Sequence, residues 1–180
     1  MERLFISTKY VIMIQQTLVV LKPDAVKRGF IGEIITRFEK VGLHIVAMKM
    51  VRVDEALAHA HYEGIGTMIT RYSDRVYRVN ADFMMHGPVV AIVLEGIQAI
   101  PVVRKLAGAT DPKEALPGTI RGDFAHTTRD YANSQDAWLP NLLHASANPE
   151  EAMPEIALWF KPEEIHAHEA ESNLFKRGHK

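Results

Sequence analysis

The chain has 180 residues, of which 47% are hydrophobic and 24% charged, and its formal net charge is −1. These values are typical of one soluble globular domain with a core of its own. A near-neutral charge argues against nucleic acid as the main ligand, since such proteins usually carry a clear basic excess. The absence of cysteine excludes disulfides, thiolate catalysis and cysteine-based zinc sites, and it fits a cytoplasmic protein.

The two ends of the chain differ from its middle. We expect residues 1–13 to form a dispensable N-terminal extension, because they hold no motif residue and polar side chains interrupt any signal-peptide core. Met13 is another plausible start. Residues 166–180 have the composition of a polar C-terminal tail, so 14–165 would be the single domain. No stretch reaches the roughly 18 apolar residues of a membrane span, so no membrane partner is expected.

Strand-like and helix-like patterns alternate along this domain. Apolar or alternating runs predict strands at 17–21, 43–53, 88–96 and 141–144. Helical spacing, caps or N-terminal prolines predict helices at 30–41, 54–62, 97–106 and from 149 onwards. Residues 64–80 fit neither pattern well, and the Pro- and Gly-rich stretch 111–140 is typical of a long loop. This order resembles an α+β, ferredoxin-like sandwich with a four-stranded antiparallel sheet and additional helices.

One of the nine histidines has an unusual context. His44 lies in an apolar strand, where a structural histidine is the default. His59 and His61 are two apart on a predicted helix and point to different faces. His144 instead ends a short apolar strand, shortly before the helix start at Asn148, and helix N-termini attract anions.

Cationic residues collect at motif-like places, although no P-loop and no protein-kinase motif is present. Lys22 ends the first strand, and Arg104 lies on the third helix shortly before Thr110. Arg121 stands beside a glycine in a loop, where its guanidinium could bind phosphate oxygens in a bidentate way. Arg129 lies in the long loop, and we expect it to matter little.

Taken together, several segments resemble the nucleoside diphosphate kinase family. They are TLVVLKPDAVKRGFIG (17–32), His61-Tyr62, GPVVAIVLEG (87–96), RKLAGATDP (104–112), PGTIRGDF (117–124) and residues 141–160. They follow the family order over most of the chain. The resemblance implies a ferredoxin-like core, nucleoside di- and triphosphate substrates carrying Mg²⁺, a ping-pong reaction, and a homo-oligomer, either a hexamer or a tetramer.

The resemblance also implies roles for individual residues. His144 would be the phosphorylated nucleophile, Glu155 the carboxylate that orients it, and Ser146 the hydroxyl that supports this carboxylate. The residues that would hold phosphates or sugar are Lys22, Tyr62, Arg104, Thr110, Arg121 and Asn141. Phosphoryl transfer needs positioning and charge neutralisation, so Lys22 would also be catalytic. Mg²⁺ would be carried mainly by the nucleotide, with no protein ligand, and broad base tolerance is expected.

The sequence departs from the family pattern at four places. HAS replaces the usual HGS after position 143, which should be harmless. Pro154 directly precedes Glu155 inside the helix and is expected to kink it. Extra residues lie between Tyr62 and Gly87, so the family's base-stacking aromatic falls at Val76, with Tyr77 beside it as the candidate. The stretch 125–140 is also longer than usual.

Two other functions remain open on the sequence alone. A ferredoxin-like RNA-binding module would show stacking aromatics on its central strands, and 88–96 has none. A nucleotide-binding regulator without chemistry would have lost part of the catalytic set, whereas His144, Glu155 and the cations are all present.

Overall fold

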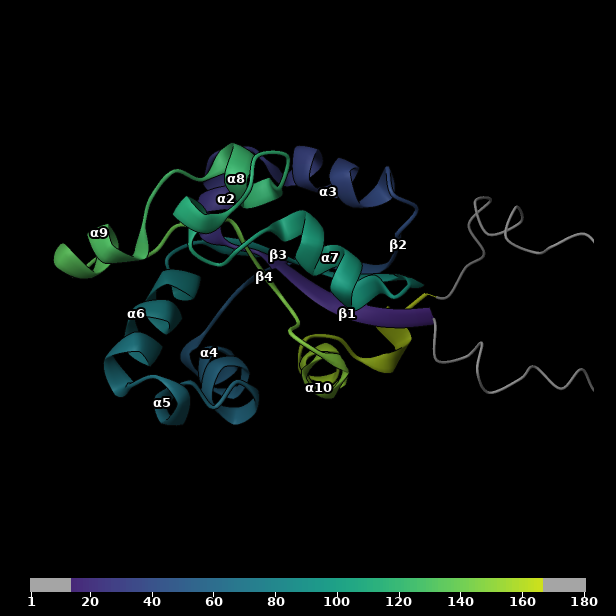
Figure 1. Cartoon of the computed structure of the whole chain (residues 1–180). Coiled ribbons are helices and arrows are strands. Elements are labelled where there is room, and N and C mark those ends of the chain that lie inside the picture. The colour runs from purple at the N-terminus through teal and green to yellow at the C-terminus, as the bar shows by residue number, and fades with distance from the viewer. Residues whose placement is uncertain (1–13, 167–180) are drawn as a thin grey trace, which may run out of the picture.

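Four strands form one antiparallel sheet in the order β2-β3-β1-β4 (Figure 1). They are β1 (Ile14–Leu21), β2 (His44–Arg52), β3 (Pro88–Ile97) and β4 (Leu143–Ala145). The computed structural model describes residues 14–166. The expectations for residues 1–13 and for nearly all of the tail therefore lie outside the described residues. The expected fold class, a ferredoxin-like α+β sandwich with additional helices, is confirmed.

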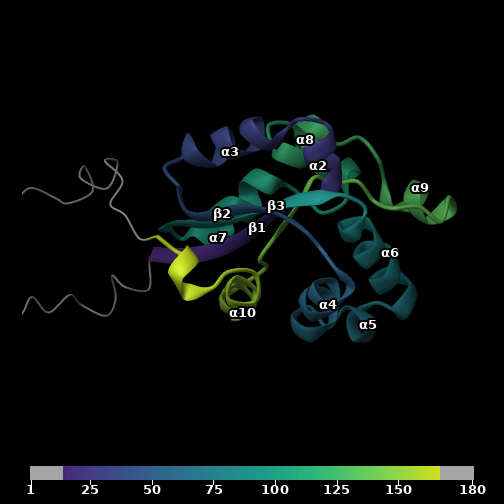
Figure 2. The same ribbon diagram turned by 180° about the vertical axis from the view of Figure 1, so that it is seen from behind.

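Helices cover both faces of this sheet. In chain order they are α2 (Pro23–Lys27), α3 (Ile31–Glu39), α4 (Glu55–His59), the π-helical η1 (Ala60–Ile65), α5 (Met68–Arg71), α6 (Asp74–Met85), α7 (Ala99–Ala107), η2 (Pro112–Glu114), α8 (Ile120–Phe124), α9 (Arg129–Ser134), α10 (Pro149–Trp159) and η3 (Pro162–Glu164). Figures 1 and 2 show α2, α3 and α8 on one side of the sheet and α4, α5, α6 and α10 on the other. No helix within residues 14–166 has the length and apolar character needed to span a membrane.

The central strands β1 and β3 each contain a continuous apolar run, because there both of their faces pack against helices. On β1, Val19 and Leu21 pack with α3 and α7, whereas Leu18 and Val20 pack with α4, α6 and α10. Successive strand residues point to opposite faces, so two cores need two interleaved sets of apolar residues. β3 repeats the pattern, which explains the continuous apolar run that the sequence shows there.

The stretch expected to be one long loop contains short helices instead. Within 111–140 the structure forms η2, α8 and α9, and the uncertain stretch 64–80 is occupied by η1, α5 and most of α6. Side-chain caps start these helices: Thr119 Oγ1 accepts from the Gly122 amide at 3.1 Å, and Thr128 Oγ1 from the Tyr131 amide at 3.0 Å. The expectation of a loop was wrong because helices of three to six residues show no apolar period.

The glycine in α8 offers a test of this packing. Gly122→Ala should lower the free energy of unfolding by about 1–3 kcal/mol, because the new Cβ would overlap the Leu116 carbonyl, a backbone group that cannot rotate away. Gly32→Ala is the matched control in α3, where a Cβ meets nothing within 4 Å. It should be neutral or stabilise by up to about 1 kcal/mol. Urea unfolding followed by circular dichroism measures both, and equal stability of Gly122→Ala and the parent would contradict the close approach.

Candidate active site

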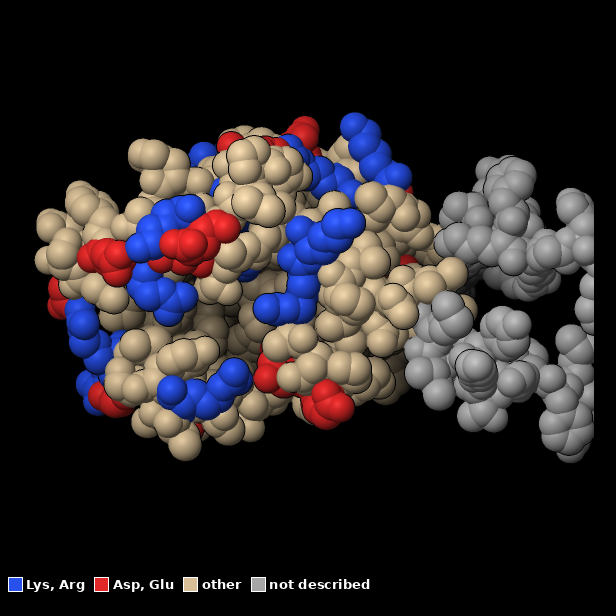
Figure 3. Space-filling view, in the orientation of Figure 1, with Lys and Arg blue, Asp and Glu red and all other residues tan. Residues whose placement is uncertain are grey.

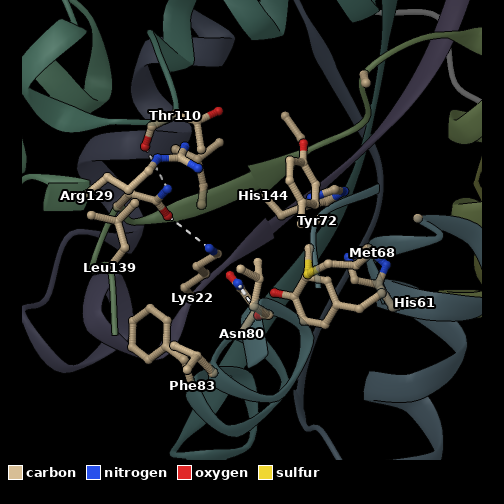
Figure 4. A pocket seen from close by; sticks show the side chains of 18 of the residues that line it. Lys22, His61, Met68, Tyr72, Asn80, Phe83, Thr110, Arg129, Leu139 and His144 are labelled. Atoms are coloured by element: carbon tan, nitrogen blue, oxygen red, sulfur yellow. Dashed lines mark hydrogen bonds between the residues drawn. The ribbon is translucent and has the colours of Figure 1, made fainter. Parts of the chain in front are cut away.

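A cavity of about 360 Å³ lies between the α5–α6 segment and the segments that follow α7, with β4 and α10 beside it. Figure 3 shows the hollow bordered by Lys and Arg side chains, and Figure 4 shows the residues inside. The charged residues of its lining are Lys22, Arg71, Arg75, Arg104, Arg121 and Arg129, against Glu151 and Glu155. This excess of cations favours an anionic ligand.

His144 is held at one nitrogen by a buried carboxylate. Strand β4 pairs His144 with Val20 of β1, which places the imidazole on the sheet face covered by α10. Its Nε2 lies 2.8 Å from Glu155 Oε1, and Glu155 Oε2 accepts from Ser146 Oγ at 2.6 Å. A carboxylate only accepts, so Nε2 carries the proton and Nδ1 keeps its lone pair.

The environment of Glu155 keeps this carboxylate charged. Its side chain is only 2% exposed, and burial alone would raise the pKa. The attraction of His144 and the hydrogen bonds from His144 and Ser146 outweigh burial, so the pKa of Glu155 lies below its usual value. Ser146 is itself fixed to β1, since its amide donates to the Leu18 carbonyl and its Oγ accepts from the Leu18 amide, both at 3.1 Å.

Pro154 does not displace this carboxylate. Helix α10 continues through the proline from Pro149 to Trp159, and both oxygens of Glu155 keep their hydrogen bonds. The helix starts as expected, with Asn148 Oδ1 accepting from the Glu151 amide at 2.8 Å. The proline therefore leaves the hydrogen bond between His144 and Glu155 intact.

His61 is a member of the site for which no role was expected. The indole Nε1 of Trp159 donates to His61 Nδ1 at 3.3 Å, and the His61 ring meets the His144 ring edge-on, with centroids 4.5 Å apart. Burial, His144 and Lys22 lower the pKa of His61 to about 3, against the opposing effect of Glu155. His61 is therefore an uncharged side chain packed against His144. In the sequence, only its place next to Tyr62 in the family segment could have indicated that it belongs to the site.

His61, His144 and Glu155 together form a set of three groups that a metal ion could also use, with ligand atoms within 4.8 Å of one another. One of these distances, however, is the 2.8 Å hydrogen bond between His144 and Glu155. We therefore interpret the set as a hydrogen-bonded pair of His144 and Glu155 with the His61 ring packed beside it.

Lys22 belongs to a chain of hydrogen bonds at the end of β1. Its Nζ donates to Asn141 Oδ1 at 2.9 Å, and Asn141 Nδ2 donates to the Thr110 carbonyl at 2.9 Å (Figure 4). Burial and the charge of Arg121 lower the pKa of Lys22 to about 8, although Asp24 acts in the opposite direction. The ammonium is thus charged at neutral pH but close to losing its proton.

The two expected arginines differ in their surroundings. Arg121 is buried, and its guanidinium donates to the carbonyls of Asn141, Gly108 and Leu143 at 3.0, 2.7 and 2.7 Å. Burial and Arg104 lower its pKa to about 10, so it stays charged at neutral pH. Three of its five N–H groups are used, which leaves two for a ligand. Arg104 is exposed and makes no hydrogen bond or ion pair with any described residue.

The hydroxyl of Tyr62 is available to a ligand. The side chain lines the cavity and is 6% exposed, and its buried hydroxyl has no hydrogen-bond partner among residues 14–166. Burial and the charge of Glu155 raise its pKa, so the phenol keeps its proton and can donate.

The expected base-stacking candidate is not part of the cavity lining. Val76 lines the cavity, but Tyr77 packs into the second core with its ring 5.9 Å from His59. Tyr72, 58% exposed, is an unexpected aromatic of the lining, and so is the unexpected cation Arg129 (Figure 4). Counting back from Gly87 does not find Tyr72, because the extra residues between Tyr62 and Gly87 shift the register. Arg129 lies in the stretch 111–140, whose Pro- and Gly-rich composition predicts one long loop.

A histidine oriented by a buried carboxylate, in a pocket rich in cations, defines an enzyme that transfers phosphoryl groups. Residues 15–165 match the family model described as nucleoside diphosphate kinase. The chain is 48% identical over 153 residues to the nucleoside diphosphate kinase of Borreliella burgdorferi, covering 85% of this chain and 91% of the relative. It is 48% identical over 165 residues to that of Pyrococcus horikoshii, covering 91% and 97%.

A solved structure described as a transition state mimic of the Borrelia burgdorferi enzyme with bound vanadate and ADP has a TM-score of 0.88 to this chain. It is 45% identical and covers 91% of this chain and 97% of its own. The chain therefore belongs to the nucleoside diphosphate kinase family, and it is a transferase that acts on nucleotides.

The buried His61 predicts a specific pH dependence of stability. Its pKa is about 3 in the folded chain against 6.5 as the ordinary value, so between these pH values the unfolded chain binds the extra proton. Its contribution is thus complete above pH 6.5 and is lost as the pH falls, by up to about 1.4 kcal/mol per pH unit. His61→Gln should flatten the rise of the unfolding free energy between pH 4.5 and 6.5.

Urea unfolding at pH 4.5, 5.5, 6.5 and 7.5 measures this slope. His126→Gln, at an exposed histidine outside the cavity lining, is the control and should follow the parent. The same slope in His61→Gln and the parent would show that His61 does not titrate as a buried neutral group.

Proposed function

We propose that this chain transfers the γ-phosphate of a nucleoside triphosphate to a nucleoside diphosphate by a ping-pong mechanism through phospho-His144. The observation that supports it most directly is the hydrogen-bonded series Ser146–Glu155–His144. It occupies Nε2 and leaves Nδ1 as the nucleophilic nitrogen in a cavity lined with cations.

The proposed reaction has two balanced steps. In the first, the Nδ1 lone pair forms a bond to the γ-phosphorus while the bond from this phosphorus to the β,γ-bridging oxygen breaks, and the diphosphate leaves with the electron pair. In the second, a terminal oxygen of another diphosphate attacks the phosphorus and the lone pair returns to Nδ1. Glu155 offsets the positive charge that the ring gains during the first step.

The surrounding residues would hold the nucleotide. Lys22, Arg104 and Arg121 would neutralise the phosphates, since phosphoryl transfer depends mainly on positioning and charge. Tyr62, with its unpartnered hydroxyl, would donate to a phosphate oxygen. Lys22 and Asn141 could also bond sugar hydroxyls, and Thr110 would bond phosphate or sugar at the exposed rim. Contacts confined to sugar and phosphate would tolerate every base.

Mg²⁺ fits this site as a companion of the nucleotide. The two acids of the described lining already have partners: Glu155 has His144 and Ser146, and Glu151 lies 3.4 Å from both Arg71 Nη1 and Asn148 Nδ2. No free carboxylate among the described lining residues would then ligate the ion. Bound to phosphate oxygens, Mg²⁺ would supply further charge neutralisation.

We further propose a closed homo-oligomer, a tetramer or a hexamer, in the cytoplasm. β2 is an edge strand, and its Met48 and Met50 side chains are 54% and 58% exposed. Exposed apolar side chains along a sheet edge are suited to contact with another subunit.

Labelling with γ-labelled ATP tests the proposed intermediate. The parent should yield an acid-labile, alkali-stable phosphoprotein, and His144→Ala should yield none, because the substitution removes the nitrogen that Glu155 orients. His126→Ala is the control and should label like the parent. Normal labelling of a folded His144→Ala variant would refute the mechanism, and a parent without label would favour a catalytically inactive nucleotide-binding protein.

Lys22 predicts that nucleotide binding weakens in alkaline solution. Its pKa of about 8 means that the ammonium loses its proton as the pH rises through 8, while the phosphates of ADP are already ionised above pH 7. The dissociation constant of ADP, measured by calorimetry, should therefore rise between pH 7 and 9, by at most about tenfold per pH unit. Lys22→Gln should bind ADP more weakly and with a flatter profile. A flat profile in the parent would contradict the role of this charge.

A further inference from the structure

The segment 125–140 contributes several lining residues to the cavity, and hydrogen bonds attach it to two other parts of the chain. On the α7 side, the Arg129 amide donates to Asp111 Oδ2 at 3.2 Å, and Lys113 Nζ lies 2.7 Å from Asp130 Oδ2. Asp111 directly follows Thr110, which lines the cavity. The first turn of α9 is therefore tied to the segment that we expect to contact the phosphates.

The other end of this segment is attached to α6. Arg75 Nη2 lies 2.6 Å from Asp136 Oδ1, and Trp138 Nε1 donates to Asp82 Oδ2 at 2.9 Å. The Trp138 ring also stacks on Phe83, with centroids 5.3 Å apart. Each contact alone is modest because these groups are largely exposed. Contacts at both ends nevertheless hold α9 in place at the cavity wall.

Arg129 projects from this held segment into the cavity. Its side chain lines the cavity, and Figure 4 shows it on the same side as Thr110, facing Tyr72 and His61 across the space. The arginines of the opposite wall are neutralised, Arg71 by Glu151 at 3.4 Å and Arg75 by Asp136. The Arg129 guanidinium has no hydrogen-bond or ion-pair partner within the described range 14–166.

We propose that Arg129 binds the polyphosphate of the nucleotide, as a fourth cation beside Lys22, Arg104 and Arg121. Asp130, its exposed neighbour, already pairs with Lys113 at 2.7 Å and offsets the charge of Arg129 only in part. The guanidinium donors are therefore free for an anion, in a cavity whose lining carries more cations than acids. Charge-assisted hydrogen bonds to phosphate suit its planar donors. The inference deepens the proposed function, on which it rests, and it replaces the expectation that Arg129 matters little.

Calorimetric titration with ADP and with GDP tests the contact without requiring turnover. Arg129→Ala should raise both dissociation constants by a similar factor of about ten, which is the loss of one charge-assisted hydrogen bond. Arg129→Lys should recover part of the affinity because it keeps the charge. Arg78→Ala is the matched control, since Arg78 is an exposed arginine of α6 outside the lining, paired with Asp74 at 2.7 Å.

The melting temperature without nucleotide should be the same for Arg129→Ala and the parent, because the side chain has no partner in the described structure to lose. Unchanged ADP affinity, a loss for only one of the two bases, or a lowered melting temperature that accounts for the loss would each overturn the inference. Labelling with saturating γ-labelled ATP separates the two proposals. An unlabelled parent refutes the proposed function, whereas a labelled parent with normal ADP affinity in Arg129→Ala refutes this inference alone.

Discussion

The position of β4, the strand that carries His144, depends on one buried cation, Arg121. Its guanidinium binds the carbonyls of Gly108, Asn141 and Leu143, and so ties the end of α7 to both sides of the residue that precedes β4. A buried guanidinium without partners would be very costly, so these carbonyls must stay where they are. Since His144 follows Leu143 directly, the same interaction that satisfies the cation also sets the position of the proposed nucleophile.

The backbone between these carbonyls is strained. Leu142 is fully buried and has φ of +73°, a left-handed conformation that a leucine rarely adopts and that costs on the order of 1–3 kcal/mol. Its amide donates to Asp24 Oδ2 at 3.0 Å, and its carbonyl accepts from the Lys22 amide at 2.8 Å. The turn lets Asn141 meet Lys22 while Leu142 and Leu143 enter the core on the α3 side. Strain at this point is thus part of how the site is built.

Long elements with a regular apolar pattern could be predicted from the sequence, whereas short helices and contacts between distant residues could not. The strands β1 and β3 were predictable because burial on both faces requires continuous apolar runs, and α10 because Asn148 and Pro149 mark its start. Helix α9 was not predicted, because six residues are too few to show the apolar period of a helix. The assignment of His144 and Glu155 came from the family resemblance, since no period or spacing shows that a carboxylate eleven residues away reaches the imidazole. The sequence could not show that Tyr77 packs into the second core or that Arg129 lines the cavity, because composition does not tell which way a helix or loop residue points.

The distribution of charge in the cavity explains why phosphate should dominate recognition. Lys22 and Arg121 are buried among few counter-charges, and this lowers the pKa of both. Arg104 and Arg129 lie at the exposed rim of the cavity. Bringing these cations together without a ligand costs free energy, and a polyphosphate relieves that cost at every one of them. The base would gain no comparable electrostatic stabilisation, because Val76 and the exposed Tyr72 offer it mainly apolar surface. We therefore expect affinity to depend on the number of phosphates that reach the cations, and to depend little on which base follows them.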